Sequence, residues 1–182
     1  MLSENRFTLF GIMLWICSLT IESISSWPKG SIIMAGSTYN YVTFIRTTPE
    51  QLWAALTTAE FMKKFWLGAH FETEWRAGAA WKLLFEDGSV ADTGEILECE
   101  PPKRLVLKWR NEFMPELKAE GYSQCVMEIE AVNDTATKLT VTHSIAVENS
   151  KLINAVSGGW PRILSNLKSL IETGEVVLPP KK

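Results

Sequence analysis

The clearest hydrophobic pattern of the chain lies near its C-terminus, in GGWPRILSNLKSLIETG, residues 158–174. Apolar side chains recur there every three or four positions, as they do along one face of a helix. This stripe consists of Trp160, Ile163, Leu164, Leu167, Leu170 and Ile171. We predict a helix with Pro161 in its first turn and Gly174 at its C-terminal cap. Gly158 and Gly159 are expected to allow either a sharp, mobile start of the helix or a close-packed turn.

The middle of the chain alternates between apolar and polar residues, which is the period of a half-buried strand. Short turns separate the alternating segments, and Asp87-Gly88 is a strong two-residue hairpin signal. The predicted strands cover residues 39–46, 70–76, 80–86, 90–99, 104–110, 124–132 and 137–147. Residues 111–121 are predicted to form a loop. Because short turns join antiparallel neighbours, these strands form a meander with one apolar face.

Two short helices are predicted between the first two strands. Thr48 is placed to cap the first helix, Pro49 suits its first position, and Gln51 completes a capping box. The second helix covers residues 59–64. The order of elements predicts an α+β fold, in which the long C-terminal helix covers the apolar face of a curved antiparallel sheet.

The first 33 residues differ in composition from the rest and are predicted to lie outside the fold, which would cover residues 34–182. Residues 7–21 are apolar but short for a membrane span, which needs about 20 apolar residues, so no stable span is expected. Three interpretations stay open: an over-extended gene start ahead of Met34, a signal peptide, and a structural role. We expect a cytoplasmic protein, or an exported one if residues 1–25 act as a signal.

Composition narrows the classes of function. The formal net charge is −3 and no Lys/Arg run is present, which argues against a nucleic-acid partner. The three cysteines, Cys17, Cys99 and Cys125, have no metal-ligand spacing, and their odd number favours a reducing compartment. Eight tryptophans are many for 182 residues, and they suit either a bulky core or an aromatic-lined cavity.

The wide side chains on the predicted inward face favour a cavity between the sheet and the helix. A solid aromatic core at normal packing density is the alternative. The predicted ligand-binding residues are Trp66, Trp81, Phe85, Trp109, Met127, His143, Trp160 and Leu164.

His143 is the one weak candidate for catalysis. Strand alternation places it on the inward face, between Val141 and Ile145. An imidazole there can hydrogen-bond a ligand carbonyl or act as a general acid or base. The more frequent role of such a histidine is that of a satisfied core group.

Other polar clusters give weaker signals. His70, Glu72 and Glu74 share one face of a strand but are spread along it by ~6.6 Å between alternate residues, so no metal site is predicted. Asp92 and Glu95 are interpreted as solvated residues of hairpins. No cofactor is expected, since the sequence contains no G-x-S-x-G, G-x-G-x-x-G or Walker motif.

Four segments carry a resemblance to a known superfamily. They are FIRTTPEQLWAALTTAEFMKKFW (44–66), GEILECEPPKRLVLKW (94–109), KLTVTHSI (138–145) and the C-terminal segment 158–174. In order and spacing the chain resembles the START/Bet v 1-like superfamily, also called SRPBCC. Within it, the chain is similar to the bacterial branch of domains like the activator of Hsp90 ATPase. The likeness covers about residues 39–174.

The resemblance implies a helix-grip fold, in which a curved antiparallel sheet wraps around a long C-terminal helix and two short helices follow the first strand. It also implies a deep apolar cavity for a lipid, polyketide or other small hydrophobic molecule. We therefore expect a protein that binds a small hydrophobic, lipid-like or polyketide-like ligand. The first alternative is a cyclase or hydrolase type of enzyme that uses His143 in the cavity.

The second alternative is a co-chaperone-like module that contacts Hsp90. The co-chaperone of the family name carries a separate N-terminal domain that makes much of the chaperone contact. Residues 1–33 are too few and too apolar to supply such a domain, which counts against an Hsp90 partner. The sequence leaves a homodimer open and does not identify the ligand.

Overall fold

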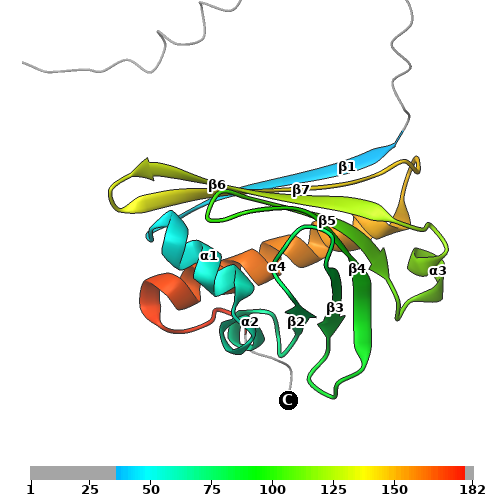
Figure 1. Ribbon diagram of the computed structural model, residues 1–182, viewed down its shortest axis with the longest axis horizontal. Coiled ribbons are helices and arrows are strands. Elements are labelled where there is room, and N and C mark those ends of the chain that lie inside the picture. Colours follow the sequence, from blue (N-terminus) through cyan, green and yellow to red (C-terminus); the bar gives the residue numbers. More distant parts are fainter. Residues whose placement is uncertain (1–35, 179–182) are drawn as a thin grey trace, which may run out of the picture. The chain divides into compact units, whose positions relative to one another are not determined.

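The computed structural model describes residues 36–178, in which a curved sheet wraps around a long helix (Figure 1). The predicted extension over residues 1–33 lies outside the described residues. The strands are β1 (Ser37–Ile45), β2 (His70–Thr73), β3 (Ala80–Leu84), β4 (Val90–Glu100), β5 (Arg104–Asn111), β6 (Ser123–Asn133) and β7 (Ala136–Ile145). The helices are α1 (Pro49–Thr57), α2 (Ala59–Phe65), α3 (Pro115–Lys118) and α4 (Lys151–Thr173). This architecture confirms the predicted α+β helix-grip fold.

The sheet is an antiparallel meander with one long crossover. Its order is β1-β7-β6-β5-β4-β3-β2, so β1 pairs with the last strand, from Ser37 opposite Ile145 to Ile45 opposite Thr137. Helices α1 and α2 carry the chain from one edge of the sheet to the other. Bulges in β3–β4, β4–β5 and β6–β7 increase the local twist, which helps the sheet to curve.

Helix α4 lies along the concave side of the sheet (Figure 1). Its buried side chains are Leu152, Ile153, Trp160, Leu164, Asn166 and Leu167. Strand β7 presents alternate residues to the same interior, and the predicted inward face of this strand is confirmed. No helix among residues 36–178 is long and apolar enough to cross a membrane.

The predicted start of the C-terminal helix is wrong. The Ser150 hydroxyl accepts a hydrogen bond from the backbone N–H of Ile153 at 3.1 Å and so caps a helix that begins at Lys151. Gly158 and Gly159 therefore lie inside the helix rather than at its start, and so does Pro161. Burial of the apolar stripe, which extends back to Leu152 and Ile153, outweighs the low helix propensity of glycine and proline.

Two further local predictions need correction. The predicted loop over residues 111–121 contains the one-turn helix α3. Thr48 caps α1 as expected, accepting from the backbone N–H of Gln51 at 3.3 Å. The side chain of Gln51, however, accepts a hydrogen bond from the Thr47 hydroxyl at 3.0 Å, so the capping box is only half formed.

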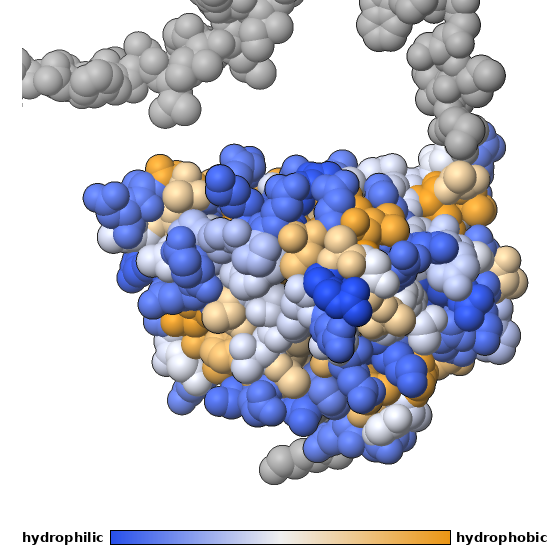
Figure 2. All heavy atoms as spheres, in the orientation of Figure 1, coloured by the Kyte–Doolittle hydropathy of each residue, from blue (hydrophilic) through white to orange (hydrophobic). Residues whose placement is uncertain are grey.

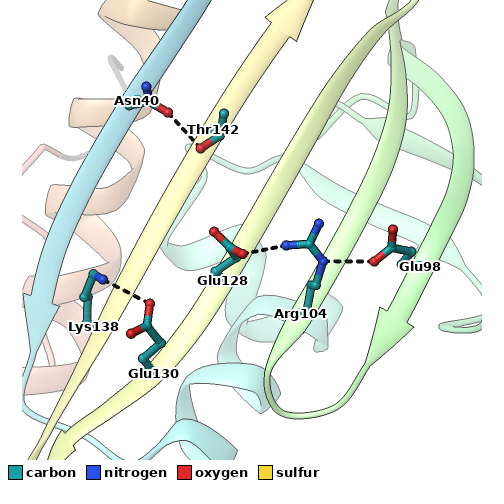
Figure 3. Close-up of polar contacts among 7 residues, drawn as sticks. All are labelled: Asn40, Glu98, Arg104, Glu128, Glu130, Lys138 and Thr142. Carbon is teal, nitrogen blue, oxygen red and sulfur yellow. Dashed lines mark hydrogen bonds and ion pairs between the residues drawn. The ribbon is translucent and has the colours of Figure 1, made fainter. Parts of the chain in front are cut away.

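The outer face of the sheet is polar. Arg104 lies between Glu98 and Glu128 and pairs with both, and Lys138 pairs with Glu130 at 3.0 Å (Figure 3). Exposed ion pairs of this kind add little stability, although they fit the register of the strands. Figure 2 shows a mostly hydrophilic surface with small apolar patches.

Candidate functional site

A pocket of about 300 Å³ lies between α4 and strands β3, β4 and β5. The residues of α4 that line it fall between Leu152 and Ile163, so the pocket occupies the N-terminal half of the helix. Most of its other lining is apolar, and the polar exceptions are Asp92, Asn111 and His143. A wider hollow of about 440 Å³ on the outer face of the sheet is lined by exposed charged side chains and offers less apolar surface.

Three indoles form one wall of the pocket. Trp66 follows α2, Trp109 belongs to β5 and Trp160 to α4. The ring centroids lie 5.5 Å apart for Trp66 and Trp160, and 6.1 Å apart for Trp109 and Trp160, both with edge-to-face geometry. Aromatic pairs favour this arrangement, so the wall is well packed behind the cavity.

His143 is completely buried in this wall, and both of its ring nitrogens are engaged. Its Nδ1 accepts a hydrogen bond from the indole N–H of Trp160 at 3.3 Å, which leaves the proton on Nε2. The Nε2–H then donates to the Ser123 hydroxyl at 2.8 Å, and that hydroxyl donates to the carbonyl of Trp109 at 3.1 Å. His143 is therefore a satisfied core group that orients Trp160.

Burial also determines the charge of His143. Desolvation lowers the pKa of its imidazole to about 4, so the ring is neutral at physiological pH. In this arrangement both nitrogens of the neutral imidazole are bound to groups of the protein. The observed contacts of His143 are thus with its protein neighbours, and its role in catalysis stays a prediction.

Asp92 lies in the pocket, which corrects its interpretation as a solvated hairpin residue. Only 7% of it is exposed, whereas Glu95 is exposed on the outer face as expected. Asp92 pairs directly with Asn111 across β4 and β5, and its Oδ1 accepts from the Asn111 amide at 2.9 Å. The amide oxygen of Asn111 accepts in turn from the backbone N–H of Met114 at 2.9 Å, so the pair has a fixed orientation.

The environment of Asp92 disfavours its charged form. Burial raises the pKa of its carboxyl to about 6, and the negative charge of Glu112 acts in the same direction. Hydrogen bonds from Trp109 and Asn111 oppose the shift without cancelling it. The pocket therefore holds a carboxylate that is costly to bury and still ionised at neutral pH.

The segment from Asn111 to Gly121 forms a lid over the pocket. Phe113, Met114 and Leu117 supply its apolar side. Glu112 joins two parts of the lid through its ion pair with Lys118 at 2.6 Å, and it attaches the lid to the sheet through Thr93 of β4 and Arg110 of β5. Hydrogen bonds from Lys118, Thr93 and Arg110 lower the pKa of Glu112 to about 2.

Glu120 anchors the far end of the lid to the start of α4. Its carboxylate accepts from the backbone N–H groups of Lys151 and Leu152 at 2.8 and 3.2 Å, and from the Ser150 hydroxyl. Burial raises the pKa of Glu120, but these hydrogen bonds lower it more. A carboxylate at a helix N-terminus is favourable because of the exposed N–H groups and the helix dipole.

The structure brings together five of the eight predicted ligand-binding residues. The five that line the pocket are Trp66, Phe85, Trp109, His143 and Trp160. Trp81, Met127 and Leu164 are buried elsewhere in the core. Leu164 lies in the C-terminal half of α4, beyond the residues of this helix that line the pocket.

Trp81 is excluded from the pocket by its neighbours in the sheet. It pairs with Gly94, and a Cβ at Gly94 would lie only 2.8 Å from the indole ring. The ring also packs against Phe71 and Trp109, with centroids 4.9 and 4.7 Å away. Trp81 thus fills the core behind the pocket.

Asp92, Asn111 and the residues of the lid line the pocket but were not among the predicted ligand-binding residues. Asp92, Gly94 and Ile96 are alternate residues of one strand, and Ile96 is fully buried. Counting back from Ile96 in steps of two would therefore have placed Asp92 on the inner face. No comparable signal identified the lid. Within the described chain, no group of three or more metal-ligating side chains occurs, and Glu72 and Glu74 are exposed.

The fold and the pocket define a helix-grip protein of the SRPBCC superfamily. Residues 46–172 match the family model described as Activator of Hsp90 ATPase homolog 1-like protein, and the chain belongs to this family. The resemblance seen in the sequence is thereby confirmed. No curated protein sequence matches the chain.

Solved structures share the fold. An HSP90 activator from Plasmodium falciparum is 23% identical with a TM-score of 0.61, and the match covers 74% of this chain and 96% of that chain. The Aha1 dimer from Colwellia psychrerythraea is 21% identical with a TM-score of 0.61, over 76% and 98%. DynU16, a protein of the dynemicin biosynthetic locus, is 21% identical with a TM-score of 0.61, over 76% of this chain and 48% of that chain.

Proposed function

We propose that the protein binds a small hydrophobic molecule in the pocket between the sheet and the N-terminal half of α4. The observation that carries this proposal is the apolar pocket of about 300 Å³, backed by three indoles and covered by the lid. Ligand pockets have volumes of about 300 Å³ and more, so this one suits a molecule of modest size. The similar fold of DynU16, from a biosynthetic locus, supports a ligand-binding role.

The size of the pocket limits the expected affinity. A chain of about eight carbons gains roughly 6 kcal/mol from burial, at about 0.8 kcal/mol per methylene. Association costs about 4 kcal/mol or more in lost translational and rotational freedom. Because the gain exceeds this cost by only a small margin, we expect weak binding of a simple alkyl probe and tighter binding of the natural ligand.

Octanol is a suitable neutral probe for this proposal. We expect saturable binding of one molecule per chain, measured by isothermal titration calorimetry and by the emission of the pocket tryptophans. Gly159 lines the pocket, and a Cβ at this position meets no atom within 4 Å, so Gly159→Leu places its side chain in the cavity. We expect this variant to lose binding by about tenfold or more.

The matched control is Gly158→Leu. Gly158 belongs to the same turn of α4 but is exposed, and it does not line the pocket. This control should bind octanol as the native protein does. Absence of saturable binding, or equal loss in both variants, contradicts the proposed pocket.

The enzyme alternative that relies on His143 receives no support from the geometry. Its imidazole donates and accepts within the protein and stays neutral down to about pH 4. We therefore propose ligand binding as the function of the pocket.

The partners of the protein are also proposed. The Colwellia protein is described as a dimer, which favours a homodimer here, and light scattering after gel filtration tests it. The Plasmodium protein is described as an HSP90 activator, so Hsp90 is a second proposed partner. A change in the ATPase rate of Hsp90 when this chain is added tests that proposal. Cys99 and Cys125 are free thiols, which suits the proposed cytoplasmic location.

A further inference from the structure

The lining of the pocket carries a negative charge. Among its lining residues in the described chain, Asp92 is the one charged side chain, because His143 is neutral. Asp92 is 7% exposed, and the rest of the pocket lining consists mostly of indole, phenyl and aliphatic groups. A negative charge in such a place is normally accompanied by a cation.

No cation of the protein fulfils this role in the described residues. The charged group that acts on Asp92 is Glu112, which is itself negative and is paired with Arg110 and Lys118. Asn111 and the indole of Trp109 contribute neutral hydrogen bonds only. Their donation satisfies part of the carboxylate, but each carboxylate has about four acceptor sites and keeps its charge.

We infer that the ligand of this pocket is an amphiphile whose apolar body lies against the three indoles and whose protonated amine binds the carboxylate of Asp92. This inference rests on the proposed binding function. The amine N–H groups donate to the Asp92 oxygens, and the positive charge compensates the buried negative one. The pair Asp92–Asn111 is oriented by Met114 before the ligand arrives, so no rearrangement of these side chains is required.

Other head groups fit this site less well. A hydroxyl donates one hydrogen bond but leaves the charge uncompensated. A carboxylate or phosphate head group would bring a further negative charge next to Asp92, on which the negative charge of Glu112 already acts. The site therefore selects amines over alcohols and alcohols over acids.

The test uses three probes with the same apolar body: octylamine, octanol and octanoate, titrated into the full chain by calorimetry near neutral pH. We expect octylamine to bind about tenfold or more tightly than octanol, with octanoate weakest. Asp92→Asn retains the shape and the acceptor for Asn111 but removes the charge. In this variant we expect octylamine to bind no more tightly than octanol, because its positive charge has no counter-charge in the pocket.

Glu95→Gln is the matched control. It removes one negative charge from the same strand, but Glu95 is exposed and lies outside the pocket. The preference for octylamine should persist in this control, which separates a specific contact from general attraction to an acidic protein.

A second measurement does not depend on any variant. Lowering the pH below about 6 protonates Asp92, so the preference of the native protein for octylamine should decline there. Glu112, the charged group that acts on Asp92, has a pKa of about 2 and does not titrate in this range. Its partner Arg110 stays charged, since the hydrogen bond to Glu112 raises the pKa of the guanidinium group.

The outcomes separate this inference from the proposed function. Binding of octanol together with equal or weaker binding of octylamine overturns the amine preference and leaves the pocket. Retention of the preference in Asp92→Asn overturns the role of Asp92. If none of the three probes binds, the proposed function is overturned as well.

Discussion

At the scale of single residues, two buried ionisable groups line the pocket, and their pKa values shift in opposite directions. Burial raises the pKa of Asp92 to about 6 and lowers the pKa of His143 to about 4. In both cases desolvation favours the neutral form. Between about pH 4 and pH 6, a rise in pH lowers the stability of the fold through Asp92 and raises it through His143. The two contributions therefore offset each other in the native protein.

Replacing Asp92 reveals one of these effects. Its folded-state pKa lies above the ordinary value of 3.8, so ionisation costs stability once the pH rises above about 4, and the full cost is present above about 6. We expect Asp92→Asn to stabilise the fold by about 2 kcal/mol more at pH 7 than at pH 4. Urea denaturation at the two pH values measures this. An equal effect at both values would show that the carboxyl is not desolvated.

Replacing His143 reveals the other effect. Because its folded-state pKa is depressed, the unfolded chain takes up the proton first as the pH falls below about 6.5, and the native fold loses stability. His143→Leu leaves the Ser123 hydroxyl and the Trp160 indole without this partner, which costs about 2–4 kcal/mol at pH 7. Since leucine does not titrate, the deficit should shrink by about 1–2 kcal/mol at pH 5. Denaturation curves at both pH values test this, and a deficit that is constant with pH contradicts it.

At the scale of elements, α4 combines a strong amphipathic face with residues that weaken helices. Gly158, Gly159 and Pro161 occupy its middle. The glycine at position 159 leaves space in the pocket, and Pro161 has no N–H to donate to the preceding turn. Part of the stability that a regular helix would have is thus absent where the helix borders the ligand site.

The two glycines allow a direct measurement at this scale. Both positions lie inside the helix, and a Cβ at either meets no atom within 4 Å. We expect Gly158→Ala and Gly159→Ala each to raise the free energy of unfolding by about 0.5–1 kcal/mol. Thermal or urea denaturation measures the gain. Destabilisation by either alanine would show that the helix needs a glycine for its backbone conformation.

At the scale of the whole molecule, the pocket is formed by parts of the chain that are far apart in sequence. The segment after α2, the strands β3, β4, β5 and β7, the lid and α4 all contribute residues to its lining. The lid is fastened to α4 through Glu120 and to itself through Glu112. Occupation of the pocket should therefore stabilise the entire fold.

A ligand-dependent melting temperature tests this coupling. A probe at ten times its dissociation constant adds about 1.4 kcal/mol to the stability, since it binds only the folded chain. For a domain of this size we expect the melting temperature to rise by about 3–5 °C with octanol. Differential scanning calorimetry measures the shift. In Gly159→Leu the shift should vanish, and a shift of equal size there would place the probe outside the pocket.

The sequence by itself determined the architecture. Periods of two and of three to four residues identified the strands and the long helix, because these periods follow from backbone geometry and need no tertiary information. Wide inward side chains also indicated five residues that line the pocket, including Trp109 and Trp160. The superfamily followed from the order of these elements.

Only the tertiary structure decided the chemistry of the site. His143 became a satisfied group because Ser123 and Trp160, 20 and 17 residues away along the chain, supply its partners. Asp92 became a buried charge because β5, the lid and α4 close over it. The true start of α4 depended on how much apolar surface the concave sheet could cover. Burial and partner choice are properties of the assembled fold, and a local pattern does not contain them.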